Sequence, residues 1–361
     1  MMGKIIIVNN KENIFAQIDK EILTKSNFKV EFFHSETSFK WLFKNFFSLI
    51  KKIKSSQLVF AWWAKNFLPF FIAKILNKRS ILIAGGGHII VDDNLKGIYP
   101  KVYNSQPFFW KILIKKSLTY ADIVVVPSEF CRKNVLKIKP DIKDKIRVVY
   151  NCVNLGEFNI IPSGKYVPKF IGTTCFLYKY ALYTKGLNYL FQAVKTIYEY
   201  LKEKGIKVMI IGNDKGGKKS IIRYVKELKI EDLIVFKNYD FKTKREYAEF
   251  IKKNFLIYIQ PSIVETFGMA MVEAMACGIP VIASSGGALP EVLKKSGIVV
   301  NIKDVKDFSR ALITLMEDRE KREKLGNLAK KVVSENYSCE KRREKLESII
   351  NSLMKDVKKD N

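Results

Sequence analysis

With 361 residues, the chain is too long for one typical core and suits two domains of roughly 100 to 200 residues each. Its 48% hydrophobic and 28% charged residues are those of a folded globular protein and exclude a low-complexity chain. The 64 Lys and Arg residues against 36 Asp and Glu residues leave a formal charge of +28, which attracts polyanions such as nucleic acid, anionic lipid headgroups or phosphorylated substrates.

Two further features bound the class of protein. The N-terminal apolar run, Ile5 to Val8, is too short for a signal-peptide core, and the longest apolar stretch, residues 58–76, is interrupted by Lys65, Pro69 and Lys74. We therefore expect neither a signal peptide nor a spanning helix. The cysteines are scattered singly without a C-x-x-C pair, so we expect reduced thiols in a cytosolic protein at all five positions: Cys131, Cys152, Cys175, Cys277 and Cys339.

Apolar runs rich in β-branched residues alternate with helical patterns along the first part of the chain. The expected strands are "KIIIV", "KVEFF", "QLVFAWW", "SILIA" and "DIVVV". Helices are expected between them, over residues 14–24 and 39–54, from the third strand to residue 76, and over 107–120. This alternation is typical of a parallel sheet that is covered by helices on both faces.

The alternation restarts after a turn-rich segment, with expected strands "FIGTTCF", "KVMIIG", "LIVF", "LIYIQPS", "PVIAS" and "GIVV" and expected helices over 187–202, 221–228 and 246–254. We place the boundary near residues 155–168. The sequence thus predicts an α/β protein of two doubly wound, Rossmann-like domains facing a cleft, over residues 1–160 and 161–335. A C-terminal helix over 336–361 is expected to pack back toward the N-terminal domain.

The segment "ETFGMAMVEAMACGIPVIASSGG" carries two acids, Glu265 and Glu273, among small and apolar residues. A helix predicted from Phe267 or Gly268 to Ala276 puts Glu265 just before a helix N-terminus, where free amides and the helix dipole favour phosphate. At 1.5 Å per residue, Glu273 lies about 12 Å away. That separation exceeds the roughly 5 to 9.5 Å of a glycoside hydrolase pair. It suits two carboxylates that contact the two ends of a nucleotide-sugar. The alternative is that Glu265 only stabilises the start of the helix and that Glu273 is a solvated position on the helix.

The segment Pro261 to Val292 resembles the signature of the family 4 glycosyltransferases, which are retaining enzymes of the GT-B fold. The resemblance continues in "TKGLNYLFQAV", "VMIIGN", "VPSEFCRKNVL" and "VVYNCVN", whereas the first 90 residues match only in pattern. It implies a metal-independent hexosyltransferase that needs no cofactor. The implied donor is a UDP-, GDP- or ADP-linked sugar, and the implied acceptor is a glycan or a lipid-linked molecule of cell-envelope polysaccharide, glycolipid or protein-glycan synthesis.

The resemblance also implies roles for particular residues in binding the donor. Glu265 would contact the hydroxyls of the transferred sugar and Glu273 the ribose. The backbone amides near Phe267, Gly268 and Met269 would contact the phosphates and the sugar. Transfer would occur on the front face with retention, and the departing phosphate oxygen would take the proton of the acceptor.

Three cations or potential cations complete the implied site. Lys185, in "TKG", matches the lysine that neutralises the leaving diphosphate, and a contact of this kind at about 4 Å is worth about 4 kcal/mol before desolvation. Lys179 stands nearest to the place of an upstream arginine, although a lysine lacks the bidentate fork of arginine. His88, at the end of "SILIAGGGH", matches a histidine that faces the sugar in this family.

A basic and aromatic stretch indicates a further partner. No acidic residue occurs from Thr37 to Val91, where nine basic residues occur. The predicted helix over 39–54 carries an apolar stripe made of Phe39, Leu42, Phe43, Phe46, Ile50 and Ile53. A basic amphipathic helix of this kind favours contact of residues 39–80 with an anionic membrane surface, and the alternative is a core stripe with solvated lysines. We expect a cytoplasmic protein that is peripheral on the cytoplasmic membrane face.

Two other functions compete with this interpretation. A nucleotide-sugar epimerase shares the GT-B fold and would release a changed sugar without an acceptor. A basic nucleic-acid-binding protein would explain the charge but not the two glutamates, and we expect no nucleic-acid partner because no such motif occurs. "GNDKGGKKS" fails as a P-loop because Lys219 stands where Ser or Thr must hold magnesium.

Overall fold

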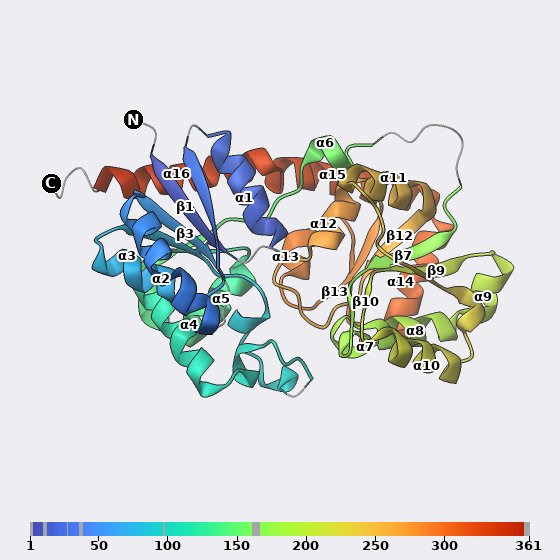
Figure 1. Cartoon of the computed structure of the whole chain (residues 1–361). Helices are drawn as coiled ribbons and strands as arrows, with labels where there is room; N and C mark the ends of the chain where they lie inside the picture. The colour runs from blue at the N-terminus through green and yellow to red at the C-terminus, as the bar shows by residue number, and fades with distance from the viewer. Residues whose placement is uncertain are drawn as a thin grey trace. The chain divides into compact units, whose positions relative to one another are not determined.

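The computed structural model describes residues 3–9, 13–26, 28–35, 39–96, 98–160 and 167–356, with the side chains of residues 39–43 and 356 left aside. The chain forms two compact units (Figure 1). Unit 1 comprises Met1–Asn151 and Cys339–Asn361, and unit 2 comprises Cys152–Ser338. The segment in which we expected the boundary includes residues 161–166, which lie outside the described residues.

Unit 1 is built on a parallel sheet of six strands in the order β2-β1-β3-β4-β5-β6. The strands are β1 (Lys4–Asn9), β2 (Lys29–His34), β3 (Leu58–Trp62), β4 (Arg79–Ile83), β5 (Ile123–Val126) and β6 (Ile146–Val148). β1 pairs with β2 from Lys4 opposite Lys29 and with β3 from Ile5 opposite Leu58. β3 and β5 are apolar along their whole length because helices cover both faces of the sheet.

Alternate strand residues enter two hydrophobic cores. Val8, Val59 and Leu82 pack under four helices, α2 (Phe39–Lys54), α3 (Leu68–Ile75), α4 (Phe108–Tyr120) and α5 (Glu129–Ile138). Ile7 and Phe60 face α1 (Ile14–Thr24) and α16 (Cys339–Asp356) on the other side. Short 3-10 turns complete the unit: η1 (Gly87–Ile89), η2 (Asp93–Leu95), η3 (Tyr103–Ser105) and η4 (Pro140–Lys145).

The last helix, α16, is held in unit 1 by a buried ion pair. Arg342 donates through Nε to Oδ1 of Asp19 (2.6 Å) and through Nη2 to Oδ2 (2.9 Å), and Trp62 also donates to Oδ2 (3.1 Å). The Nη1 group of Arg342 donates to the carbonyls of Val149 and Tyr150. Because both charges are paired and hydrogen-bonded, the loss of either partner would leave an uncompensated charge in the core.

Unit 2 contains a second parallel sheet, in the order β11-β9-β7-β12-β13-β14, and a two-stranded sheet, β10-β8. The strands are β7 (Phe170–Thr174), β8 (Leu177–Tyr178), β9 (Lys207–Ile211), β10 (Asp214–Lys215), β11 (Ile234–Lys237), β12 (Phe255–Gln260), β13 (Val281–Ser284) and β14 (Ile298–Val300). Its helices are α6 (Leu155–Phe158), α7 (Ala181–Thr184), α8 (Leu187–Thr196), α9 (Tyr198–Glu203), α10 (Lys218–Glu227), η5 (Glu231–Leu233), α11 (Lys244–Asn254), α12 (Met269–Ala276), α13 (Leu289–Leu293), α14 (Val305–Glu317) and α15 (Arg319–Asn336).

The structure interrupts one predicted helix. The helix expected over residues 187–202 consists of α8 and α9, which meet at Ile197. Ile197 leaves the helical region of dihedral angles, with φ −113° and ψ 25°, and keeps its side chain in the core. No helix within the described part of the chain combines the length and the hydropathy that a membrane crossing requires.

The expectation of five reduced cysteines was wrong for two of them. Cys131, Cys175 and Cys277 form no disulfide, whereas Cys152 and Cys339 are disulfide-bonded. Both cysteines stand where the chain passes from one unit to the other, and no C-x-x-C or other local pattern indicates a disulfide at either position.

Candidate active site

The candidate site of unit 2 begins at two neighbouring parallel strands, β7 and β12, whose carboxyl ends meet at one edge of the sheet. A hydrogen bond fixes the segment after β12, since the backbone N–H of Ile263 donates to the carbonyl of Thr184 (3.1 Å). Gly186 makes this approach possible, because its φ is +63° and an added Cβ would lie 1.7 Å from the carbonyl oxygen of Pro261. The turn places Lys185 beside the "PSIVE" segment.

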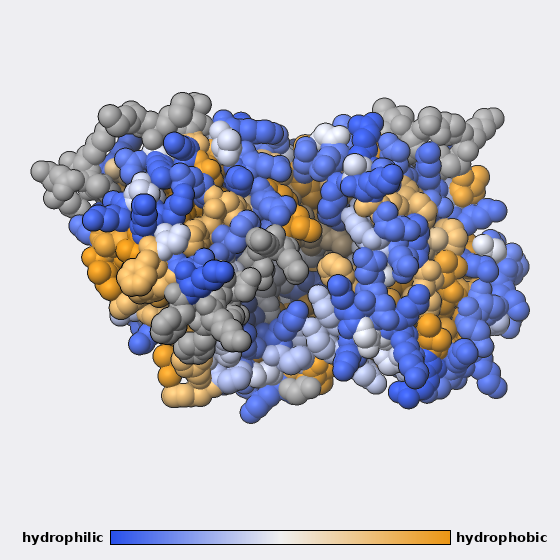
Figure 2. All heavy atoms as spheres, in the orientation of Figure 1, coloured by the Kyte–Doolittle hydropathy of each residue, from blue (hydrophilic) through white to orange (hydrophobic). Residues whose placement is uncertain are grey.

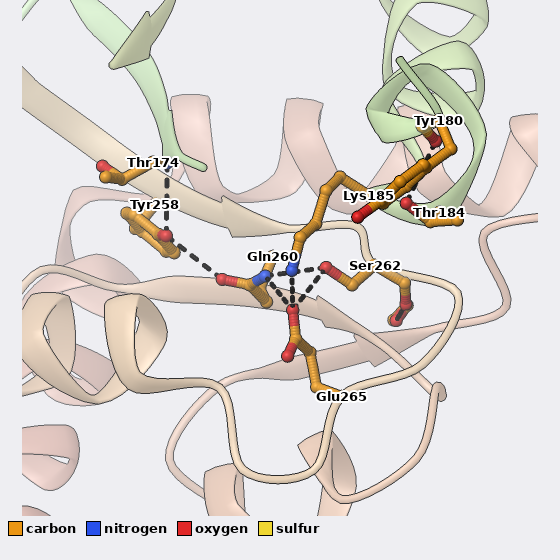
Figure 3. A network of polar contacts seen from close by, with 9 residues as sticks. Thr174, Tyr180, Thr184, Lys185, Tyr258, Gln260, Ser262 and Glu265 are labelled. Atoms are coloured by element: carbon orange, nitrogen blue, oxygen red, sulfur yellow. Dashed lines mark hydrogen bonds and ion pairs between the residues drawn. The ribbon is translucent and has the colours of Figure 1, made fainter. Parts of the chain in front are cut away.

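Three donors converge on one oxygen of Glu265 (Figure 3). Oε1 accepts from Nζ of Lys185 (2.6 Å), Oγ of Ser262 (3.0 Å) and Nε2 of Gln260 (3.5 Å). The side chains of Lys185 and Glu265 are 29% and 17% exposed. No described residue donates to Oε2 of Glu265, so the carboxylate is anchored by one oxygen and can accept from a ligand with the other.

A chain of hydrogen bonds orients these donors (Figure 3). The backbone N–H of Thr174 donates to Oη of Tyr258 (3.3 Å), and the Tyr258 hydroxyl donates to Oε1 of Gln260 (3.1 Å). Gln260 then donates through Nε2 to Oγ of Ser262 (2.9 Å), and Ser262 donates to Glu265. Burial raises the pKa of Tyr258 well above its ordinary value, so its hydroxyl keeps the proton it donates. Sequence reasoning missed Tyr258, Gln260 and Ser262, although a glutamine that ends a buried strand is a signal for such a role.

The backbone of Glu265 is fixed by the glycine loop that follows β13. The backbone N–H of Ala288 donates to the Glu265 carbonyl (2.8 Å). Gly287 has φ +63°, and an added Cβ would lie 2.3 Å from the same carbonyl oxygen. The "SSGG" that follows "PVIAS" therefore allows close packing of two loops and holds Glu265 in place.

Glu273 lies on α12 and forms the second acid of the site. Its side chain is 9% exposed and accepts through Oε1 from Nζ of Lys244 (2.6 Å). The Lys244 ammonium also lies 5.6 Å from the ring centroid of Tyr239 and 5.7 Å from that of Tyr247. Burial alone lowers the pKa of Lys244, but the attraction of Glu273 and Tyr239 outweighs it and raises the pKa above its ordinary value. Lys244 was not among the residues singled out from the sequence.

The helix predicted from Phe267 or Gly268 begins at Met269. Gly268 is its N-cap in the left-handed region, and no side chain caps the first turn. Phe267 is buried and packs edge-on against Tyr337, with ring centroids 5.4 Å apart, so only its backbone can meet a ligand. Because residues 265–268 are not helical, the 1.5 Å rise does not apply to the whole span between Glu265 and Glu273.

Lys179 follows β8 and is exposed, with its side chain beside Gly216. No hydrogen bond between described residues joins it to Glu265 or Lys185. The nearby "GNDKGG" loop is closed by Asp214, whose Oδ1 accepts from the amides of Gly216, Gly217 and Lys218 at 2.9 to 3.0 Å. The amides that a P-loop would offer to phosphate are taken by this carboxylate.

His88 belongs to unit 1 and lies in η1, after β4. It is buried, its Nε2 accepts from the backbone N–H of Ala64 (3.2 Å), and its ring packs edge-on against Trp63. Burial, with a smaller contribution from Lys65, lowers the pKa of His88 to about 3. The imidazole is therefore neutral at physiological pH, with Nδ1 left to carry the proton.

The site offers no ionised thiol as a nucleophile. Cys175, which follows β7 and lies near Lys185 and Glu265, is a free cysteine, and burial raises the pKa of its thiol to about 11. No group of three His, Cys, Asp or Glu residues within the described ranges is placed to hold a metal ion.

The two units, each built on a six-stranded parallel sheet, have the GT-B fold. A solved structure of the Anabaena protein HepE in complex with UDP and glucose shows the same fold, with a TM-score of 0.77 and 15% sequence identity, and the likeness covers 97% of this chain and all of that one. Residues 173–332 match the model of the family glycosyl transferases group 1.

Curated relatives agree with this family. An uncharacterized glycosyltransferase of Methanocaldococcus jannaschii is 30% identical over 60% of this chain and 56% of its own length. A GDP-mannose-dependent monoacylated α-(1-6)-phosphatidylinositol monomannoside mannosyltransferase of Corynebacterium glutamicum is 39% identical over 25% of this chain and 24% of its own length. The matching segments thus span little more than half of the first relative and a quarter of the second.

Proposed function

We propose that the protein transfers a sugar, with retention of its anomeric configuration, from a nucleotide-sugar donor to a hydroxyl group of a glycan or lipid-linked acceptor. One observation carries the proposal: Glu265 is anchored through Oε1, receives no described donor at Oε2, and lies 2.6 Å from the Lys185 ammonium. A ligand that meets both groups must present a hydroxyl close to an anion. A nucleotide-sugar has this arrangement, because hydroxyl groups of its sugar lie close to its charged diphosphate.

In this proposal Oε2 of Glu265 accepts from a hydroxyl of the transferred sugar, and Lys185 turns from Glu265 to the departing diphosphate. Each charge-assisted bond contributes on the order of 1.5 to 3 kcal/mol. The uncapped first turn of α12 offers further amide donors to the diphosphate. Glu273 accepts from the ribose hydroxyls, and Phe267, Gly268 and Met269 contribute through their backbone only.

The proposed reaction needs no covalent intermediate with the protein. The bond between the anomeric carbon and the diphosphate oxygen breaks, and the bond to the acceptor oxygen forms on the same face. The acceptor proton ends on the departing phosphate oxygen. Lys185 supplies the positive charge that stabilises the diphosphate, which supports a reaction without a metal ion. Glu265 stabilises the positive charge that develops on the sugar ring.

Two proposed elements of the site rest on the family resemblance. His88, as a neutral imidazole, would donate to the sugar through Nδ1. Lys179 would act as a mobile surface cation toward the diphosphate. The UDP complex of HepE and the lipid acceptor in the name of the Corynebacterium relative support a nucleotide-sugar donor and a glycolipid product, respectively.

The test uses the full chain with UDP-, GDP- and ADP-sugars, first in a thermal-shift screen and then in turnover with lipid-linked and soluble glycan acceptors. We expect one class of donor to raise the unfolding temperature and to release nucleoside diphosphate only when an acceptor is present. The product should keep the anomeric configuration of the donor by NMR, and a chelator should leave the rate unchanged. A changed sugar released without any acceptor would identify an epimerase, and stabilisation by no sugar nucleotide would overturn the proposal.

A further inference from the structure

Three neighbouring helices of unit 1 form one layer over the sheet. α3 packs between α2 and α4. Each of the three contributes to the same core, through Leu49 and Ile53, Phe70 and Ala73, and Ile114 and Leu118. Phe67, Phe71 and Tyr120 link α3 to α4 through ring contacts of 5.5 to 6.2 Å between centroids. The inward sides of the three helices therefore pack in the core of unit 1. The opposite sides of the same helices face outward together.

The outward sides carry large hydrophobic residues. Of the twelve such residues that are exposed within the described part of the chain, five lie on these helices: Phe47, Phe71, Ile75, Phe108 and Phe109. Phe47 and Phe108 are 80% and 78% exposed. Figure 2 shows hydrophobic side chains at the surface where α3 lies in Figure 1, and others near α4. Single exposed hydrophobic residues are common, but a concentration of this kind marks an interaction surface.

The same helices carry positive charge only. Their sequences contain nine lysines and no Asp or Glu. The lysines that are exposed are Lys44, Lys51, Lys52, Lys54, Lys74, Lys115 and Lys116. The helices on the opposite face of the sheet, α1 and α16, mix both signs, with acids such as Glu21, Glu340 and Glu344. The absence of acidic residues is thus a property of α2, α3 and α4 and not of the surface of unit 1 in general.

We propose that the outward side of α2, α3 and α4, termed the α2–α4 face, docks on an anionic lipid bilayer. Lysines are attracted to anionic headgroups, while phenylalanine and isoleucine side chains gain by entering the boundary between headgroups and acyl chains. A nucleic-acid duplex would use the lysines but would leave Ile75 and the phenylalanines in water. The evidence for the α2–α4 face comes from unit 1 alone. The docking proposal therefore does not depend on the proposed transfer reaction.

The experiment measures co-sedimentation of the full chain with vesicles of phosphatidylcholine, with or without phosphatidylglycerol. Two triple variants test the face: Lys44→Glu, Lys51→Glu and Lys115→Glu in one, and Phe47→Ser, Phe108→Ser and Phe109→Ser in the other. A matched charge variant on α1, its C-cap and α16 combines Lys20→Glu, Lys25→Glu and Lys345→Glu. A matched apolar control replaces Ile14, which is 57% exposed on α1, by Ser. Circular dichroism confirms that each variant is folded.

We expect binding that requires phosphatidylglycerol and weakens with added salt. Each lysine near an anionic surface contributes about fivefold to the partition coefficient, so the triple lysine variant should lose about 100-fold or more. The triple phenylalanine variant should lose binding even at low salt, and both control variants should bind much more tightly than the corresponding face variants. Equal losses in face and control variants would overturn the proposal. Failure to bind the anionic vesicles, with tight binding to duplex or single-stranded nucleic acid, would also overturn it.

Discussion

Replacing Glu265 by Gln tests the role of the free carboxylate oxygen. Glu265→Gln keeps one oxygen for the donors Lys185, Ser262 and Gln260, but the other position becomes an amide NH₂ that cannot accept from a sugar hydroxyl. The loss of one charge-assisted bond costs about 1.5 to 3 kcal/mol, or about 10- to 150-fold. Because the charge also faces the reacting sugar, we expect kcat/KM to fall by about 100- to 1,000-fold.

The assay is release of nucleoside diphosphate in the presence of acceptor, with the unfolding temperature measured in parallel. Since the Glu265 side chain is partly exposed, the free energy of unfolding should change by about 1 kcal/mol or less. Glu249→Gln is a matched control, because Glu249 is also paired with a cation, Arg245 at 3.3 Å, on α11 of the same unit. Wild-type turnover in Glu265→Gln, or an equal loss in the control, would refute the reasoning.

Three further predictions concern other parts of the two units. Lys185→Met should weaken the binding of the free nucleoside diphosphate by about 10- to 100-fold in isothermal titration, and unchanged affinity would remove Lys185 from the diphosphate site. Gly186→Ala should destabilise unit 2 by about 2 kcal/mol or more in denaturant unfolding, because φ is +63° and the added Cβ would meet the carbonyl of Pro261. An unchanged free energy of unfolding would contradict the turn at Gly186. His88 has its pKa lowered from 6.5 to about 3, so it contributes stability above pH 6.5 that is lost as the pH falls through this window. The matched variant is His88→Gln, whose amide oxygen can still accept from Ala64. The free energy of unfolding of the wild type should therefore lose its advantage over this variant by about 1.4 kcal/mol per pH unit below pH 6.5. A difference that does not change with pH would show that the imidazole is not buried in its neutral form.

The α/β fold class could be predicted because strands of a parallel sheet, which helices cover on both faces, appear in the sequence as apolar runs. The helix expected over residues 39–54 has the same bounds in the structure, since its Phe46, Ile50 and Ile53 repeat at helical spacing toward the core. The break at Ile197 could not be foreseen, because its apolar side chain continues the helical pattern while its backbone does not. The small β8-β10 sheet was missed because two-residue strands leave no periodicity.

The two acids of the site and Lys185 were visible in the sequence, but the pairing of Lys185 with Glu265 and the presence of Lys244 were not. Lys185 and Glu265 are 80 residues apart and meet through the adjacent ends of β7 and β12 and the turn at Gly186. The bond between Lys244 and Glu273 likewise depends on how α11 and α12 pack. Such contacts depend on the tertiary arrangement of loops, which no local pattern encodes. Assignment to family 4 and the roles of His88 and Lys179 stay predictions.

The most direct test is a crystal structure of the protein with the nucleotide-sugar that the turnover assay selects. The proposal predicts a sugar hydroxyl within hydrogen-bond distance of Oε2 of Glu265 and a diphosphate oxygen on Nζ of Lys185. The ribose should lie on Glu273. A bound donor that leaves Glu265 and Lys185 paired only with each other, and touches neither, would contradict the proposed function.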